Sequence, residues 1–74
     1  MDRVTFVFDT TTAALWAEEV ATTERIPCEV VPAPAESNAA CDLALVTLPG
    51  HAEPLGRALS REGVVHRRWS PTTG

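Results

Sequence analysis

Lysine is absent from this chain of 74 residues, and cysteine occurs only twice. Two cysteines are too few for the disulfide framework that stabilises small secreted folds. The start Met1-Asp2-Arg3 lacks the basic, apolar and small-residue order of a signal peptide. No apolar stretch approaches the roughly 20 residues that span a bilayer. We therefore expect a cytoplasmic protein with reduced thiols and no membrane partner.

Positive charge is also scarce, because six arginines face ten acidic residues and the formal net charge is -4. A net acidic surface argues against nucleic acid as a partner. The basic cluster His66-Arg67-Arg68 is short, and it is more typical of a solvated edge strand and tail than of an anion or RNA site. A chain of this length buries only about 60% of its unfolded surface, so we expect one thin core and no deep substrate cavity.

Hydrophobic periodicity divides the chain into four predicted strands and two predicted helices. The strands are residues 3–8, 28–31, 42–48 and 64–68, and the helices run from a cap among residues 9–12 to about 24 and from about 51 to 62. The order β-α-β-β-α-β predicts an α+β fold, a ferredoxin-like sandwich. Its four-stranded antiparallel sheet would have the strand order 4-1-3-2, with two helices on one face.

Smaller predictions accompany this fold. Trp16 falls on the apolar side of the first helix, so we expect it in the core. Pro54 fits the second helix only in the first turn, where a missing N–H costs little. Gly63 is the expected C-terminal cap of that helix. Residues 1–69 would form a single ferredoxin-like domain, and residues 70–74 a flexible C-terminal tail.

Cys41 is the most informative residue of the chain, because it lies at a predicted loop-to-strand junction. A thiol at such a junction is fixed in position by the strand and accessible from the loop. In the predicted topology the third strand begins where the first strand finishes, so Cys41 would face the start of the first helix. A helix N-terminus offers unpaired N–H groups and a partial positive charge, which favour a thiolate. Thr10, Thr11 and Thr12 add hydroxyl donors in the same place.

Two carboxylates oppose a thiolate at this position, since Asp9 closes the first strand and Asp42 follows Cys41 directly. The sequence leaves open whether the helix or the carboxylates dominate. Cys28 begins the second strand at the opposite end of the sheet, so the two sulfurs should lie about 15 Å apart, beyond disulfide reach. Cys28 is therefore more typical of a small packed residue than of a resolving or second carrier thiol.

Four segments of the chain together resemble a known family. They are Thr10-Thr11-Thr12-Ala13-Ala14, Ile26-Pro27, Val31-Pro32-Ala33-Pro34 and Cys41-Asp42-Leu43-Ala44-Leu45. Over about residues 4–68 the chain is similar to small bacterial proteins named putative selenium/sulfur carrier-like. It departs from their pattern at Ala35, where the family usually has arginine, and at Asp42, where it has glycine.

The resemblance implies that Cys41 is a carrier thiol, flanked by the three threonines and Asp42. Cys41 would hold a persulfide or selenide sulfur and relay it between partner proteins. Its donor would be a protein such as a cysteine desulfurase, and a second protein would accept the sulfur. This reading favours a carrier or interaction protein over an independent enzyme.

The alternative is a non-catalytic interaction or regulatory module in which Cys41 is structural. Exposed Trp16 or Trp69 would favour it, because aromatic anchors are enriched at interfaces. In either case the open edges of so small a sheet favour a symmetric homodimer through the second or fourth strand.

A metal-binding site is a third hypothesis for the function. Its candidate ligands are Cys28, Cys41, His51 and His66, but no pair of them has the short spacing that zinc sites use. We expect no metal and no cofactor.

Overall fold

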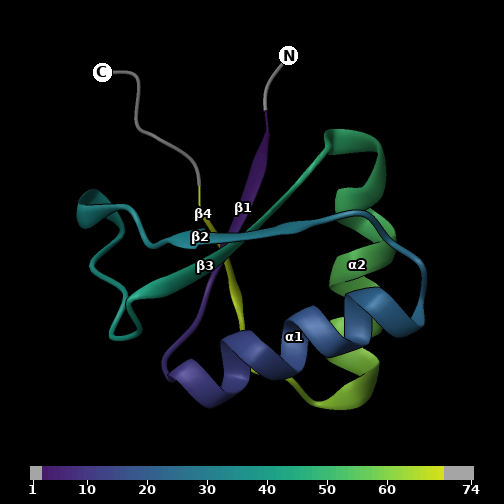
Figure 1. The fold of residues 1–74 in the computed structure, drawn as a ribbon, viewed down its shortest axis with the longest axis horizontal. Helices are drawn as coiled ribbons and strands as arrows, with labels where there is room; N and C mark the ends of the chain where they lie inside the picture. Colours follow the sequence, from purple (N-terminus) through teal and green to yellow (C-terminus); the bar gives the residue numbers. More distant parts are fainter. Residues whose placement is uncertain (1–2, 70–74) are drawn as a thin grey trace.

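The computed structural model describes residues 3–69, in which strands and helices follow the order β1-α1-β2-β3-α2-β4 (Figure 1). The elements are β1 (Val4–Val7), α1 (Thr11–Thr23), β2 (Glu29–Pro32), the short 3-10 helix η1 (Ala35–Ser37), β3 (Leu43–Thr47), α2 (Pro49–Glu62) and β4 (Arg67–Trp69). The expected tail at 70–74 lies outside the described residues. Within residues 3–69, neither helix has the length and apolar character needed to cross a membrane.

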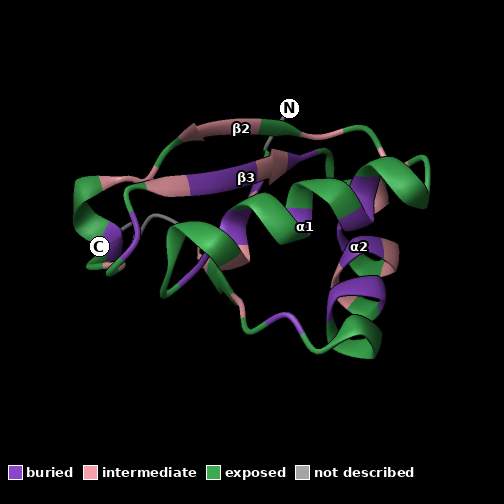
Figure 2. Ribbon diagram, turned by 60° about the horizontal axis from the view of Figure 1, so that its bottom comes forward, coloured by how far each residue is buried: buried purple, intermediate pink, exposed green. Residues whose placement is uncertain are grey.

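The four strands form one antiparallel sheet in the order β2-β3-β1-β4. This order is the predicted one, and the predicted α+β, ferredoxin-like fold is confirmed. Both helices lie on the same side of the sheet, as Figure 2 shows with the sheet above them. Phe6 of β1 has Leu45 of β3 opposite it on one side and Arg68 of β4 on the other. Directly opposite residues point to the same face, so all three side chains belong to the face that carries the helices.

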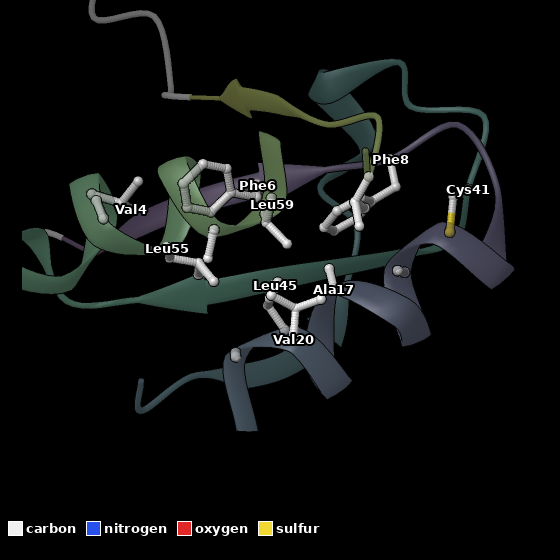
Figure 3. Packing of buried hydrophobic residues seen from close by; sticks show 14 residues of the cluster. Val4, Phe6, Phe8, Ala17, Val20, Cys41, Leu45, Leu55 and Leu59 are labelled. Atoms are coloured by element: carbon white, nitrogen blue, oxygen red, sulfur yellow. The ribbon is translucent and has the colours of Figure 1, made fainter. Parts of the chain in front are cut away.

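The core lies between this face and the two helices (Figure 3). Val4 and Phe6 of β1 and Phe8, which follows the strand, belong to it, as the alternation in the sequence predicts. Leu55 and Leu59 of α2 are fully buried against them. Each large apolar side chain that is fully buried contributes about 1.5–3 kcal/mol of transfer free energy, so this one layer of side chains is the main source of stability.

Trp16 is not in the core, so this prediction was wrong: the residue is 44% exposed. The buried stripe of α1 consists of smaller residues, Ala14, Ala17, Val20 and Ala21. Trp16 precedes Ala17 by one residue, which turns its side chain about 100° away from the centre of the stripe. Helical spacing identified the correct helix but selected the wrong edge of its apolar face.

The second helix begins earlier than predicted, at Pro49 rather than near His51. Proline is favoured at the first helical position, because its fixed φ suits the helix and its missing N–H has no partner there. Pro54 consequently lies inside the helix, and its expected place in the first turn was wrong. The missing N–H of Pro54 leaves the carbonyl of Gly50 without its helical donor, and the exposed position of Gly50 leaves that carbonyl to solvent.

The ends of β2 and β4 also differ from the prediction, whereas the end of α2 does not. Cys28 precedes β2, which continues through Pro32; proline is tolerated there because β2 is an edge strand. β4 begins at Arg67 rather than at Val64. Gly63 ends α2 in the left-handed conformation, with φ of 79°, so the predicted glycine cap is confirmed.

Candidate functional site

Cys41 lies in the connection between β2 and β3, two residues before β3 begins. Its side chain belongs to the core cluster and is only 3% exposed. Figure 3 shows the Cys41 sulfur beside the N-terminal part of α1. The predicted position of Cys41 next to the first helix is confirmed by its contact with Thr11, the first residue of α1. The prediction that this thiol is accessible was wrong, because the Cys41 side chain is buried.

Two polar groups contact the Cys41 sulfur. The thiol donates a hydrogen bond to Thr11 Oγ1 across 3.8 Å, and the backbone N–H of Leu43 donates to Sγ across 3.3 Å. The N–H of Leu43 has a fixed direction, whereas the Thr11 hydroxyl rotates and can donate to a negatively charged sulfur. The site therefore offers two donors to a thiolate or to a sulfur atom attached to it.

The three threonines named by the sequence have different positions. Thr10 is the N-cap of α1, and its Oγ1 accepts the backbone N–H of Ala13 at 3.0 Å. Thr11 contacts Cys41. Thr12 lines a shallow apolar groove with Trp16 and Val65. The structure thus brings only one of these three hydroxyls, that of Thr11, to the Cys41 sulfur, while the hydroxyl of Thr10 caps the helix.

Asp42 and Asp9 are both exposed to solvent, so water screens their charges. The backbone carbonyl of Asp42 accepts the N–H of Ala33 at 2.8 Å, which ties the two ends of the connection together. Ala35, one of the departures from the family pattern, begins η1 and is exposed. Neither departure interrupts the contacts of Cys41 with Thr11 and Leu43.

The connection from residue 33 to 42 has internal support that the sequence reading missed. Ser37 is buried; its hydroxyl donates to the carbonyl of Pro34 at 2.7 Å and accepts the N–H of Ala39 at 3.3 Å. Asn38 follows in the left-handed conformation with φ of 54°. A serine three residues after proline and followed by asparagine is a turn signal that predicts this bracing. The segment that carries Cys41 is therefore an ordered loop rather than an irregular one.

Cys28 is remote from this arrangement. It is half-buried and lines a groove of about 240 Å³ with Pro27 and Thr47. Burial raises the pKa of the Cys28 thiol, and the negative charge of Glu18 raises it further. Both cysteines are free thiols. Cys28 is thus held in its neutral form and does not contribute to the site at Cys41.

Metal binding finds no support in the part of the chain that the structure describes. Residues 3–69 contain no group of three or more histidine, cysteine or acidic side chains able to hold a metal ion. His51 lies in the first turn of α2, whereas His66 packs edge-on against Phe6. The chemistry of the candidate site is that of a single sulfur atom with two hydrogen-bond donors.

Comparison with known proteins identifies the family of the chain. A family model described as "Putative Se/S carrier protein-like" matches residues 3–69. In comparisons with curated proteins and with solved structures, the chain has no match. Because the family model covers nearly the whole chain, including Cys41 and its contacts, the chain belongs to the "Putative Se/S carrier protein-like" family.

Proposed function

We propose that this protein carries sulfur or selenium on Cys41 and relays it from a donor protein to an acceptor protein. The name of the family supports the class of cargo. The observation that carries the assignment to Cys41 is the pair of contacts at its sulfur, one with Thr11 Oγ1 and one with the N–H of Leu43. Cys28 lacks comparable support, because its environment favours the neutral thiol.

The transfer step is a thiol-persulfide exchange. The Cys41 thiolate attacks the outer sulfur of a persulfide on the donor protein, such as a cysteine desulfurase. The sulfur–sulfur bond of the donor breaks, and the donor leaves as a thiolate while a new sulfur–sulfur bond forms on Cys41. The number of electrons is unchanged, and the thiol proton of Cys41 is lost to solvent before the attack. Release to the acceptor repeats the same exchange with the roles reversed.

The two donors suit the charge that moves during this exchange. In the attacking thiolate of the proposed exchange the charge is on Sγ of Cys41, next to the N–H of Leu43. In the persulfide the charge is on the outer sulfur, one bond further from the backbone. The rotatable hydroxyl of Thr11 is the donor able to follow it.

Transfer also requires that the buried sulfur become accessible. Cys41 is part of the connection from residue 33 to 42 and not of β3, so its exposure needs movement of the connection only. The hydrogen bond between Ala33 and Asp42 closes the base of this connection. We expect a docked partner protein to displace this segment. Between transfers the segment covers the Cys41 thiol and protects it.

The test is a direct assay of sulfur loading. The reduced protein is incubated with a cysteine desulfurase and cysteine, and the peptides are analysed by mass spectrometry after alkylation. We expect the mass of one additional sulfur atom on the Cys41 peptide of wild-type protein and of Cys28→Ser. Cys41→Ser should carry none, and Cys41→Ala serves as a second variant in case serine in the core impairs folding.

Thr11→Val is the variant that tests the site rather than the thiol alone, because it keeps the shape of the side chain and removes the hydroxyl. We expect folded Thr11→Val to load more slowly than wild type, with Thr12→Val as the matched control that loads normally. Sulfur found on Cys28 in place of Cys41, or no loading of a folded protein, would overturn the proposal.

The burial of Cys41 also favours a second function, a non-catalytic interaction or regulatory module. Leu15 and Trp16 form an exposed apolar pair on α1, as expected for a surface that docks another protein. In this function Cys41 packs the core, and Cys41→Ala leaves partner binding unchanged. Sulfur loading of the wild-type protein distinguishes the two functions.

A further inference from the structure

A broad groove lies between α2 and the edge of the sheet, away from Cys41. Its volume is about 840 Å³, within the range of about 300–1,000 Å³ that small-molecule sites occupy. Phe6 and Ala52 line it together with Gly56 and Ser60, so small residues on α2 leave the space open. The remaining lining residues carry charge: Glu53, Arg57, Arg61, His66 and Arg68.

The pairing of β4 explains how the basic cluster near the C-terminus reaches this groove. Arg68 lies opposite Phe6, and Arg67 lies opposite Val7. Successive residues of a strand point to opposite faces, so Arg68 is on the helix-covered face and Arg67 is on the other. The cluster His66-Arg67-Arg68 is thus divided by the sheet, and two of its three side chains line the groove.

His66 is held in a defined orientation at this groove. Its ring packs edge-on against Phe6, with centroids 5.6 Å apart. Its Nδ1 lies 2.8 Å from the carbonyl of Val64, and because a carbonyl only accepts, Nδ1 carries the hydrogen.

The charge of the groove is opposite to that of the whole chain. Three of the six arginines line it against a single carboxylate, whereas the chain as a whole has a net charge of -4. Two of these arginines have partners: Arg57 lies 3.8 Å from Glu53, and Arg61 lies 2.9 Å from Glu24.

Both pairs are exposed to solvent, and such pairs contribute only about 0–1 kcal/mol, so a ligand can compete with them. Arg61 also lies 3.8 Å from Glu62. Arg68 forms no ion pair within residues 3–69.

We infer that this groove binds a small phosphate-bearing ligand, with the phosphate held by Arg57 and Arg68. The planar guanidinium group forms paired hydrogen bonds with phosphate, so arginines on the two sides of a groove suit this ligand. Cys41 does not line the groove, so the inference stands independently of the proposed carrier function.

The test is a titration of the ¹⁵N-labelled protein followed by NMR, with adenosine monophosphate and inorganic phosphate as separate probes. We expect the signals of Arg57 and Arg68 Nε–H to shift in a saturable manner. Arg68→Gln should weaken binding roughly ten-fold or more, because it removes charged hydrogen bonds. Arg67→Gln is the matched control, since it removes the same charge from the same strand on the opposite face.

Glu53→Gln is a variant that should strengthen phosphate binding rather than weaken it. Removing this carboxylate frees Arg57, so we expect binding up to about five-fold tighter. Tighter binding of adenosine monophosphate than of inorganic phosphate would identify an organic phosphate as the ligand, and equal affinities would identify free phosphate. Cys41→Ser should bind both probes normally.

Two results would overturn the inference. Equal weakening by Arg67→Gln and Arg68→Gln would show non-specific attraction to positive charge. Arg68-dependent binding of a polyglutamate peptide, with no response to either phosphate probe, would show that the groove instead receives an acidic protein segment.

Discussion

The two cysteines of this protein have opposite surroundings. The Cys41 sulfur is enclosed by the core and receives a hydrogen bond from the N–H of Leu43. Cys28 is half-buried and faces the negative charge of Glu18. Burial and the charge of Glu18 both raise the pKa of the Cys28 thiol and so favour its neutral form. The reactivity of each thiol is therefore set by its neighbours.

Glu18→Gln should make Cys28 more reactive toward an alkylating reagent. The substitution removes a negative charge that raises the pKa of the Cys28 thiol, so the pKa falls and more thiolate is present just below the ordinary thiol pKa. The burial of Cys28 remains, and the pKa should stay above its ordinary value. The measurement is the rate of alkylation against pH in the Cys41→Ser background, where Cys28 is the only thiol.

Glu19→Gln is the matched control, because it removes the same charge from the next position of α1. Its alkylation profile should follow that of the Cys41→Ser parent. If Glu18→Gln and Glu19→Gln gave the same profile, the charge of Glu18 would have no specific effect on Cys28.

At the level of single residues, the sequence predicted part of the candidate site. The position of Cys41 next to the first helix followed from strand order, because strand order decides which ends of elements meet. The contact with Leu43 involves a backbone N–H, which residue identity does not reveal. The burial of Cys41 depends on how Ser37 and its neighbours brace the connection, which is a matter of side-chain packing.

The helix α1 connects the site to the rest of the fold through its first turn. Thr10 is the N-cap, with extended backbone and a hydroxyl that accepts the N–H of Ala13. The next residue, Thr11, contacts Cys41. The cap that starts the helix therefore also fixes the position of the hydroxyl at the sulfur.

Thr10→Ala should lower the free energy of unfolding by about 1 kcal/mol, the usual cost of losing a threonine N-cap. Thr12→Ala is the control, because Thr12 is exposed and alanine is a better helix former. We expect Thr12→Ala to stay within about 0.5 kcal/mol of wild type or to exceed it. Urea unfolding followed by circular dichroism measures both, and an equal loss for the two variants would contradict the capping role of Thr10.

The sequence predicted the type and order of every strand and α-helix but not all of their ends, and it did not predict the 3-10 helix η1. Pro49 directly follows the predicted third strand, residues 42–48, and it is the first residue of α2. One proline has both effects, because it ends hydrogen bonding in a strand and suits the start of a helix. The misplacement of Trp16 has a different origin, since alanines rather than large side chains form the buried stripe of α1.

For the molecule as a whole, stability depends on one thin layer of apolar side chains, in which Leu55 is fully buried. Leu55→Ala should lower the free energy of unfolding by about 2–5 kcal/mol, because it removes buried methyl groups and leaves a cavity. Leu15→Ala is the matched control, since Leu15 is 50% exposed. It should change stability by no more than about 0.5 kcal/mol.

Both variants are compared by urea unfolding, with the dependence on urea concentration expected to be unchanged. A loss for Leu15→Ala as large as that for Leu55→Ala would mean that α1 is covered in solution by a second molecule. A second copy of the chain docked on α1, rather than on the sheet edges expected for the homodimer, would be one such arrangement. Dependence of the unfolding midpoint on protein concentration would reveal it.

The central place of β1 has a consequence for how the chain folds. Both neighbours of β1 come from the second half of the chain, and Thr5 pairs with Trp69. Contacts between residues far apart in sequence form slowly, because a long loop must close before any of them is gained. The earliest strand therefore has no partner until β3 has been synthesised, and its other edge stays unpaired until β4 has been synthesised. Completion of the fold on the ribosome is thus a late event that follows the emergence of β4.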